Sequence, residues 1–467
     1  MHSNRQLQLS IRITIISIVN LDFIDRENEL ASLSEKLDSG KFELVILYGK
    51  RRVGKTFMLE KLLSERRGIY FLCDKGGTLR NGERFKRLVS DYFGEQPIES
   101  NNFYDIFEHI VKKSEDRTLI VIDEFPYLIE KDDSIPSMFQ RIVDQLLLRS
   151  RVMLVLCGSS ISMMEESVLS HRSPLYGRRT MSMRLDDVAF TKLPEFFPHN
   201  SFLRNVEFYS ILGGTPHYLR KFSDRLSTKE NVASVIFNRS GSLYEEVDFI
   251  LREEFRSPET YKNIMGAIAT GSSRLVHISD KTGIKETDIR KYINNLVSLS
   301  LIRRLTSVHD TKGRKGIYVL ENNFFSFWFR FVEPFKSYLE IGNLNNAMAH
   351  FNDDFNSFVG KQVENLVRRQ LLHRLIPFPI YRSGAFWSSG IEIDAVALNK
   401  ERKEIAFVEV KWKENVDCRR ICADLMTKSK QYPHRGFKPS YFIIARSFRN
   451  ECKDCHAVRL EKLVEKQ

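Results

Sequence analysis

The first half of the chain alternates between short, continuous apolar runs and helical stretches. Apolar runs stand at 43–48, 119–122 and 152–156, and a helical run at 57–63 follows the first of them. Continuous apolar runs of this length are typical of parallel strands that are buried on both faces of a sheet. The pattern therefore predicts an α/β domain built on a parallel sheet.

The region 255–320 shows a different order of predicted elements. Its apolar residues recur at helical spacing in three segments, and two short strands follow. Helix, helix–turn–helix and a two-stranded wing together make the winged-helix pattern. The elements are helices 258–270 and 277–282, a helix capped by Thr287, and strands 301–305 and 316–320 around a basic tip, Lys312 to Lys315.

A dense aromatic stretch follows the wing. Such a stretch can stack nucleic-acid bases. A buried connector that packs the winged helix on its neighbours is favoured here, because few cations interleave with the rings. The aromatic residues are Phe324, Phe325, Phe327, Trp328, Phe329, Phe331 and Phe335.

The last 120 or so residues combine a helix with alternating strands. A helix is predicted over 355–373, with Glu364 among its inward apolar residues. Two strands joined by a polar turn are predicted at 391–396 and 406–412. Because strand side chains alternate between faces, Glu409 and Lys411 share one face, and pairing of the strands can bring Asp394 beside them.

Composition and charge limit the class of protein. The 467 residues are 42% hydrophobic and 28% charged, which excludes wholesale disorder and membrane embedding and suits about three domains. The formal net charge of +12 is unevenly placed: −1 over 1–254, +7 over 255–320, −1 over 321–345 and +7 over 346–467. If nucleic acid is the partner, we expect it to meet residues 255–467.

The first apolar strand leads into a phosphate-binding motif. The sequence after the strand fits G-x-x-x-x-G-K-[ST], and a helical run follows it, as that motif requires. Backbone N–H groups of such a loop cradle phosphates, Lys55 reaches the β- and γ-phosphates, and the Thr56 hydroxyl binds Mg²⁺. The predicted ATP-binding residues are Gly49, Lys50, Arg51, Arg52, Val53, Gly54, Lys55 and Thr56.

The next two apolar strands end in polar residues that such a site needs. Asp123 is predicted to hold the Mg²⁺ shell, and Glu124 to orient and polarise the attacking water. Ser159, after the third strand, is the candidate sensor of the γ-phosphate. Arg178 and Arg179 can stabilise charge on a transferred phosphate, although loop arginines are more often solvated or structural.

The first 250 residues resemble the archaeal and bacterial ATPase family related to the AAA+ and STAND NTPases. The resemblance implies a five-stranded sheet, with an extra strand between the P-loop and acidic strands, and a small helical lid near 196–250. It also places a winged helix after the lid. The matching stretches are Phe23 to Glu27, the P-loop, Ile122 to Pro126, Gly158 to Ser160, Pro174 to Arg179 and Gly213 to Pro216.

The C-terminal carboxylates and lysine suit metal-dependent phosphodiester hydrolysis. Asp394 and Glu409 are hard oxygen ligands for Mg²⁺ or Mn²⁺, and Lys411 can orient the water or balance developing charge. Residues 346–467 resemble the restriction-endonuclease-like PD-(D/E)XK fold, whose four positions are filled by Glu364, Asp394, Glu409 and Lys411. A nuclease-like domain that only binds DNA is the alternative.

Two close cysteine pairs stand near the C-terminus. Cys418 and Cys422, and then Cys452 and Cys455, can supply four thiolates to zinc or to an iron–sulfur cluster. Chance clustering is the alternative, because the glycines of ribbon-type knuckles are missing. Six cysteines in a chain of this length do not make a disulfide scaffold.

The expected protein is a cytoplasmic ATPase coupled to DNA binding and metal-dependent DNA cleavage, with ATP and Mg²⁺ as cofactors. The apolar run 11–19 is too short to cross a membrane, which takes about 20 residues. An ATP-gated, STAND-like switch or a DNA-binding regulator with a silent nuclease fold is the alternative, and homo-oligomerisation is left open. The expected parts are an extension (1–20), a P-loop ATPase domain (21–195), a helical lid (196–254), a winged helix (255–320), an aromatic connector (321–345) and a nuclease-like domain (346–467).

Overall fold

The computed structural model describes residues 24–310, 316–388, 390–433 and 436–465. The chain divides into two compact units, residues 1–187 and 188–467. The predicted N-terminal extension and the basic tip 312–315 lie outside the described residues. The six-part division of the sequence is finer than these two units and stays a prediction.

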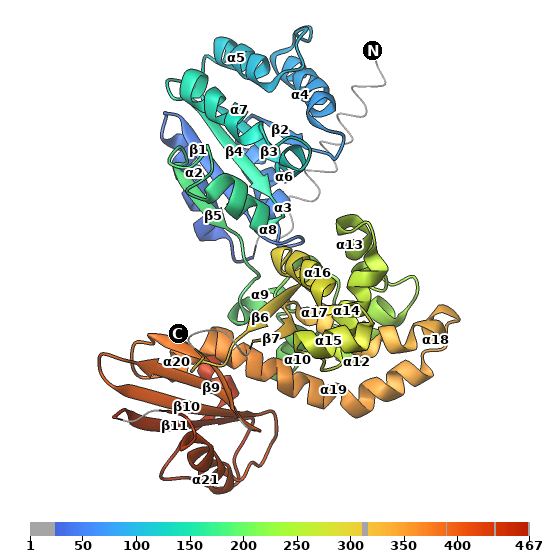
Figure 1. Cartoon of the computed structure of the whole chain (residues 1–467), viewed down its shortest axis with the longest axis vertical. Helices are drawn as coiled ribbons and strands as arrows, with labels where there is room; N and C mark the ends of the chain where they lie inside the picture. Colours follow the sequence, from blue (N-terminus) through green and yellow to red (C-terminus); the bar gives the residue numbers. More distant parts are fainter. Residues whose placement is uncertain (1–23, 311–315, 389, 434–435, 466–467) are drawn as a thin grey trace. The chain divides into compact units, whose positions relative to one another are not determined.

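The first unit is an α/β fold built on a five-stranded parallel sheet (Figure 1). The strand order is β2-β3-β4-β1-β5, so β4 lies between the P-loop strand β1 and the acidic strand β3, as the resemblance implies. The strands are β1 (Glu43–Tyr48), β2 (Gly68–Leu72), β3 (Thr118–Asp123), β4 (Val152–Gly158) and β5 (Met181–Arg184).

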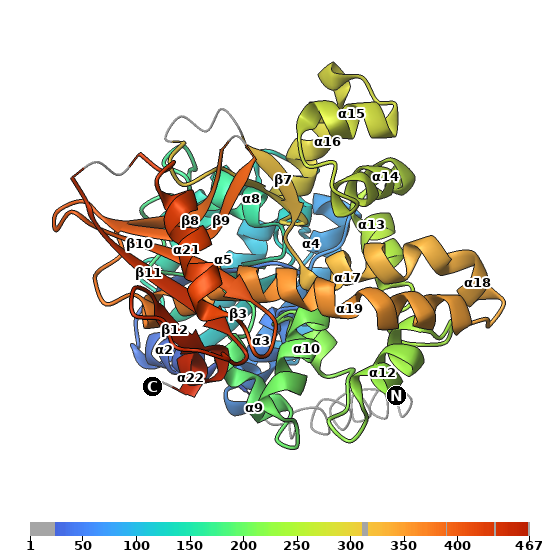
Figure 2. The same cartoon turned by 90° about the horizontal axis from the view of Figure 1, so that it is seen from below.

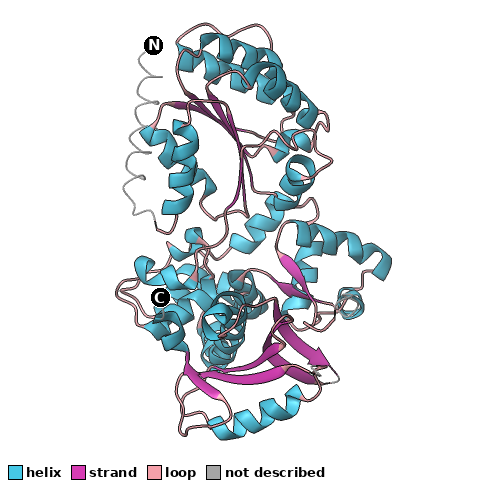
Figure 3. Ribbon diagram, turned by 90° about the vertical axis from the view of Figure 1, so that its left-hand side faces the viewer, coloured by secondary structure: helices cyan, strands magenta, loops and turns pink. Residues whose placement is uncertain are grey.

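Helices cover both sides of this sheet (Figure 3). One face packs on phenylalanines that include Phe85, Phe103 and Phe139, and the other face packs on residues that include Leu33 and Met58. The helices are α2 (Glu27–Asp38), α3 (Lys55–Glu65), α4 (Thr78–Phe93), α5 (Phe103–Lys113), α6 (Pro126–Ile129), α7 (Ile135–Ile142) and α8 (Ile161–Met164).

The second unit begins with helices and a two-stranded antiparallel sheet. The predicted order of three helices and two strands over 255–320 is present. The elements up to that point are α9 (Leu193–Phe196), α10 (Phe202–Leu212), α11 (Pro216–Leu219), α12 (Thr228–Asn231), α13 (Glu246–Glu254), α14 (Pro258–Ala269), α15 (Leu275–Thr282), α16 (Glu286–Ser298), β6 (Ile302–Leu305) and β7 (Ile317–Leu320).

The prediction that Thr287 caps the longer helix is wrong. Helix α16 begins at Glu286, and Lys285 is its N-cap residue, with no side-chain cap hydrogen bond. The backbone N–H groups of Asp288 and Ile289 donate to the Lys285 carbonyl, each at 3.0 Å, so Thr287 already lies inside the first turn.

The second unit ends in a five-stranded mixed sheet with strand order β12-β11-β10-β9-β8. Long helix α19 contacts β10 and α17 (Figure 2), and it begins ten residues earlier than predicted. The elements are α17 (Asn323–Phe331), α18 (Lys336–Glu340), α19 (Asn345–Leu366), α20 (Leu372–Leu375), β8 (Arg382–Ser388), β9 (Ile391–Asn399), β10 (Glu404–Lys411), α21 (Cys418–Ser429), β11 (Lys438–Ala445), β12 (His456–Arg459) and α22 (Leu460–Glu465).

One hydrophobic core runs through the second unit. It joins Ile293 of α16 and Phe327 of α17 to Val363 of α19 and Val408 of β10. The expectation of a buried aromatic connector is confirmed, because the six aromatic side chains of α17 are buried and the Trp328 indole donates to the Tyr244 carbonyl at 2.8 Å. These rings therefore stabilise the unit and are not available to stack on bases.

No helix in the described part of the chain combines the length and the apolar character that a membrane crossing needs.

Candidate functional site

The P-loop turns sharply between β1 and α3. Gly54, directly before the helix, has φ 95°, a left-handed conformation that glycine adopts without steric cost. A Cβ at Gly49 would lie 2.2 Å from the Leu185 carbonyl oxygen, so only glycine fits there. Arg52 has φ 70°, which strains a residue that carries a side chain. The loop is therefore held in one conformation at the positive end of α3.

The P-loop cations are held by the loop and its neighbours. The Lys55 ammonium donates to the carbonyls of Gly49 at 2.7 Å and Lys50 at 3.0 Å, and only 6% of this residue is exposed. Lys50 pairs with Asp187, and Arg51 donates to the Tyr127 hydroxyl at 2.8 Å. Lys55 thus already lies across the loop in which a phosphate would sit.

Asp123, the last residue of β3, is buried and meets three donors. One carboxylate oxygen accepts from the Thr56 hydroxyl at 3.0 Å and from the Tyr70 hydroxyl at 2.6 Å, and the other accepts from the Glu124 N–H at 2.9 Å. The structure thus brings Thr56 and Asp123 together. These hard oxygen donors fit Mg²⁺, which is commonly held by one or two protein oxygens and by the phosphates of its nucleotide.

Tyr70 is a member of this site that sequence reasoning missed. Burial and the adjacent Asp123 carboxylate raise the pKa of Tyr70, so its hydroxyl stays protonated and donates. Tyr70 lies on β2, a strand without a recognisable chemical motif in its sequence, and its side chain reaches Asp123 because β2 pairs with β3.

Glu124 and Ser159 form a pair at the carboxyl ends of β3 and β4. The Ser159 hydroxyl donates to a Glu124 carboxylate oxygen at 2.7 Å, and the Ser159 N–H donates to the same oxygen at 3.3 Å. Glu124 has φ 53°, an uncommon left-handed conformation for a side chain of this size. The two residues expected to act on water and the γ-phosphate therefore contact each other.

Both candidate phosphate-stabilising arginines have partners within the first unit. Arg178 makes a bidentate ion pair with Asp144, with both N–O distances 2.7 Å. Arg179 donates to the Leu169 carbonyl at 3.0 Å and lies over the Tyr176 ring. These contacts favour structural roles for the two side chains.

A second group of charged residues lies on β9 and β10, two neighbouring inner strands of the mixed sheet. Asp394 and Glu409 are buried, and Asp394 accepts from the Val410 N–H at 2.7 Å. Lys411 donates to Glu409 at 2.8 Å, and Lys428 of α21 donates to the same Glu409 oxygen at 3.1 Å. The second Glu409 oxygen is buried without a hydrogen-bond partner. An oxygen of this kind fits a cation, because a buried carboxylate oxygen is costly when nothing compensates its charge.

The electrostatics of this second group follow from like charges placed close together. Burial, then the Glu409 carboxylate, and then Glu364 raise the pKa of Asp394 to about 7. Burial alone would lower the pKa of Lys411, but the Glu409 carboxylate raises it overall. The predicted residues Glu364, Asp394, Glu409 and Lys411 therefore act on one another in the structure.

Three further cations accompany this group, and sequence reasoning missed them. Arg368 donates to the Asp394 carbonyl at 2.8 Å, Lys361 donates to Glu364 at 2.7 Å, and Lys428 contacts Glu409. Helical spacing could have indicated Arg368 and Lys361, because they lie four residues after and three residues before Glu364 and so share its helix face. Lys428 has no such signal, since the contact depends on how α21 packs on the sheet.

Exposed cations lie on or beside α16, in the part of the chain that is expected to meet nucleic acid. Lys285, Arg290 and Lys291 lie outside its buried stripe of Ile289, Ile293 and Leu296. Arg290 makes a 3.0 Å ion pair with Glu286, one helical turn away.

Two family models and two relatives from one archaeon match this chain. Residues 23–222 match the family of ATPase domains found predominantly in Archaea, and residues 328–421 match a family of archaeal and bacterial proteins of unknown function. Over 448 residues the chain is 37% identical to the protein MJECL04 of Methanocaldococcus jannaschii, which spans 94% of this chain and 99% of that protein. The ATP-binding protein MJ0423 of the same organism is 44% identical over 45 residues, 10% of this chain and 76% of that protein.

A solved structure carries the same fold. The Walker-type ATPase PABY2304 of Pyrococcus abyssi superposes with a TM-score of 0.50 at 21% identity, over 67% of this chain and 97% of that chain. At this identity the likeness establishes the P-loop ATPase fold, and it agrees with the predicted α/β class.

Proposed function

The chain belongs to the archaeal ATPase family that includes MJECL04 of Methanocaldococcus jannaschii, and we propose that it couples ATP hydrolysis in its first unit to DNA binding and metal-dependent DNA cleavage in its second. The observation that carries the cleavage proposal is the group of Asp394, Glu409 and Lys411, in which a buried carboxylate oxygen has no partner.

The first unit has the groups for phosphoryl transfer to water. Lys55 and the loop N–H groups bind the phosphates, Thr56 and Asp123 hold Mg²⁺, and Glu124 orients the attacking water. Mg²⁺ supplies neutralisation of the charge that develops on the phosphates. Ser159 keeps the Glu124 carboxylate in place through its 2.7 Å hydrogen bond.

The second unit has the groups for hydrolysis of a phosphodiester. Asp394 and Glu409 hold a divalent cation, which supplies polarisation of the scissile phosphate and a more acidic water. Lys411 contacts Glu409 and can orient that water or balance the developing negative charge. Glu364 adds a third carboxylate from α19.

DNA is the proposed partner of residues 255–467. The blocks 255–320 and 346–467 each carry an excess of seven positive charges, and α16 exposes cations outside its core stripe. In the winged-helix interpretation, α16 enters the major groove and the tip 312–315 contacts phosphate.

A non-enzymatic output is the rival proposal. Lys428 and Lys411 both contact Glu409, which favours a carboxylate whose charge is compensated without metal. In that case the second unit binds DNA as a switch controlled by ATP and does not cut it.

The decisive experiment assays purified full-length protein for ATP hydrolysis and for cleavage of several DNA forms with Mg²⁺ or Mn²⁺, with and without ATP. Lys55→Ala is expected to lower ATP hydrolysis by about 10²- to 10³-fold, as loss of a charge-stabilising donor does. Lys61→Ala, on the same helix, is its control.

Lys411→Ala is expected to remove DNA cleavage and to leave ATP hydrolysis intact, and the exposed Lys413→Ala is its control. Cleavage by Lys411→Ala at the wild-type rate would overturn the nuclease assignment. ATP hydrolysis without cleavage of any DNA form would favour the rival.

A further inference from the structure

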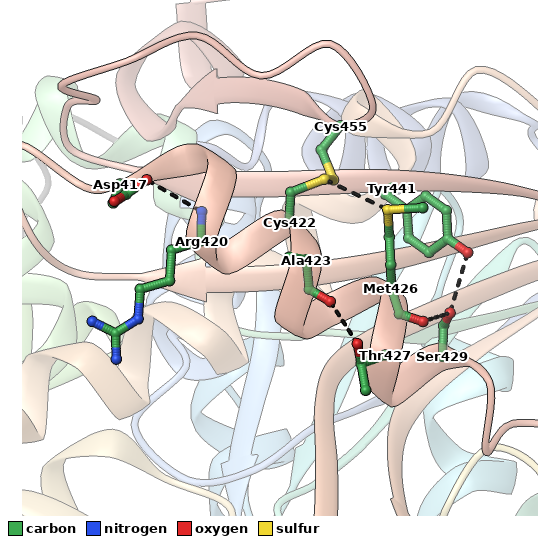
Figure 4. Close-up of a disulfide and its surroundings, with 9 residues drawn as sticks. All are labelled: Asp417, Arg420, Cys422, Ala423, Met426, Thr427, Ser429, Tyr441 and Cys455. Atoms are coloured by element: carbon green, nitrogen blue, oxygen red, sulfur yellow. Dashed lines mark hydrogen bonds between the residues drawn. A yellow bond between two sulfur atoms is a disulfide. The ribbon is translucent and has the colours of Figure 1, made fainter.

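Four of the six cysteines gather at one place in the second unit. Cys418 and Cys422 lie one turn apart on α21 and therefore share a helix face, whereas Cys452 and Cys455 lie in the segment between β11 and β12. Cys422 forms a disulfide with Cys455 (Figure 4). The sulfurs of Cys422, Cys452 and Cys455 lie within 4.8 Å of one another, and Cys418 shares a side-chain hydrogen bond with Cys452.

Polar contacts hold the two segments together independently of the disulfide. Asp417, the N-cap residue of α21, accepts from the Asn450 side chain at 3.0 Å and pairs with Arg449. The Cys418 N–H donates to the Asn450 side chain at 2.8 Å, and Arg419 donates to the Glu451 carbonyl at 3.1 Å. The segment that carries Cys452 and Cys455 is thus fixed against the start of the helix.

A structural disulfide would need only two of these cysteines. Cys418 and Cys452 remain thiols, and Cys418 is buried with no exposed surface. Metal ligation deprotonates a thiol, so a bound cation would hold both thiols as thiolates beside the sulfurs of the disulfide pair.

We propose that in the reduced protein Cys418, Cys422, Cys452 and Cys455 bind one Zn²⁺ ion, and that the Cys422–Cys455 disulfide is the metal-free form of this site. Tetrahedral ligation at a Zn–S distance of about 2.3 Å places sulfurs about 3.8 Å apart, which agrees with the close sulfur group. An iron–sulfur cluster separates its cysteine sulfurs further, because several irons lie between them.

The change between the two forms is a balanced exchange with a thiol reductant. Two R–SH groups reduce the Cys422–Cys455 bond, which takes up two electrons and two protons, and the reductant leaves as R–S–S–R. Zn²⁺ then binds the four sulfurs as thiolates and displaces four thiol protons to solvent.

The test measures zinc, and it is independent of ATP hydrolysis and DNA cleavage. Full-length protein is purified without oxygen in the presence of a phosphine reductant, and its bound metal is quantified by mass spectrometry. About one zinc per chain is expected for the wild type, and for Cys73→Ala, which changes a buried cysteine of the first unit.

The double variant Cys418→Ser/Cys452→Ser is expected to lose the zinc. It keeps Cys422 and Cys455, so the same variant purified without reductant is expected to form their disulfide. Zinc that stays at one per chain in this variant would overturn the proposal, as would a reduced wild type without zinc.

A second measurement uses Co²⁺ as a spectroscopic probe of the reduced, metal-free chain. The intense visible and near-ultraviolet absorption of a tetrahedral Co²⁺–thiolate site is expected in the wild type and not in the double variant. Iron with an equal amount of acid-labile sulfide in the purified wild type would replace the single ion with a cluster, and would overturn the zinc assignment.

Discussion

Buried carboxylates lie on strands of the sheet in both units, but their charges are compensated in different ways. In the first unit, Asp123 accepts from the hydroxyls of Thr56 and Tyr70 and from a backbone N–H. In the second unit, Asp394 and Glu409 lie close together and depend on Lys411 and Lys428. Neutral donors hold a single negative charge, whereas two neighbouring negative charges need cations.

This difference shows which of the two sites keeps uncompensated charge repulsion in the folded protein before a ligand binds. Every hydrogen bond to Asp123 is made by the folded chain, so that site is organised before a nucleotide binds. The second site keeps an unpartnered Glu409 oxygen and a pKa of Asp394 that is raised to about 7. We expect a bound cation to stabilise this site more than the first, because it relieves repulsion between two buried carboxylates.

The largest expected effect comes from removing a charge of the second site. Glu409→Gln should lower metal-dependent DNA cleavage by about 10³-fold, because it removes a cation ligand that is worth several kcal/mol in the transition state. ATP hydrolysis should stay at the wild-type rate. Cleavage is measured on labelled DNA with Mg²⁺ or Mn²⁺, and the exposed Glu401→Gln is the control.

The corresponding change in the first site should be smaller, because it removes one neutral donor. Ser159→Ala loses the hydrogen bond to Glu124, which at about 1.5–3 kcal/mol predicts a 10- to 100-fold lower kcat for ATP hydrolysis. Nucleotide affinity, measured by equilibrium binding, should not change. Ser160→Ala is the control and should keep the wild-type kcat, since the Ser160 side chain makes no cap hydrogen bond to α8. A loss of nucleotide affinity in Ser159→Ala would contradict the role assigned to Ser159.

Removal of exposed cations should change the salt dependence of DNA binding in the second unit and not in the first. Arg290→Ala/Lys291→Ala on α16 should reduce the slope of log affinity against log salt by about 2, since each lost phosphate contact removes about 0.9. Lys112→Ala/Lys113→Ala on α5 is matched, because Lys112, like Arg290, pairs with a glutamate one turn earlier. Equal slopes for the two variants, measured by fluorescence anisotropy, would contradict DNA contact by α16.

The smallest expected effect is on the free energy of unfolding. Loss of the Asp394 charge should stabilise the folded protein, although it removes a proposed ligand of the catalytic cation. Ionisation of Asp394 costs folding free energy, because its folded pKa of about 7 exceeds its unfolded pKa, so wild-type stability is lost as pH rises from about 4 to 7. In EDTA at pH 8, Asp394→Asn should therefore be more stable by about 1 kcal/mol or more, or about 2–4 °C in Tm.

The stability difference between Asp394→Asn and the wild type should depend on pH and on Mg²⁺. The gap between Asp394→Asn and the wild type should narrow as pH falls towards 4, and it should narrow when Mg²⁺ is added at pH 8. Asp353→Asn, an exposed change on α19, should show no gap. A gap that is independent of pH would mean that packing and not charge distinguishes the variant.

Much of the fold could be predicted where the signal is local. The apolar runs gave β1, β3 and β4, and G-x-x-x-x-G-K-[ST] gave the loop between β1 and α3, because these patterns lie within single elements. The proximity of Glu409 and Lys411 could be predicted for the same reason, since two strand residues with one residue between them share a face of the sheet. Threonine is a frequent N-cap residue, and a cap at Thr287 predicts a helix that begins at residue 288, but α16 begins two residues earlier, at Glu286.

The sequence by itself determined two groups of candidate residues, a phosphate-binding loop with its acidic strand and a carboxylate–lysine strand. Only the tertiary structure decided that Tyr70 contacts Asp123 across 53 residues, that Lys428 contacts Glu409, and that four cysteines from two segments meet. It also joined the predicted modules of the second unit into one core. The physical reason is that periodicity along a chain reports which face of an element is buried, whereas strand order and helix packing decide which faces meet.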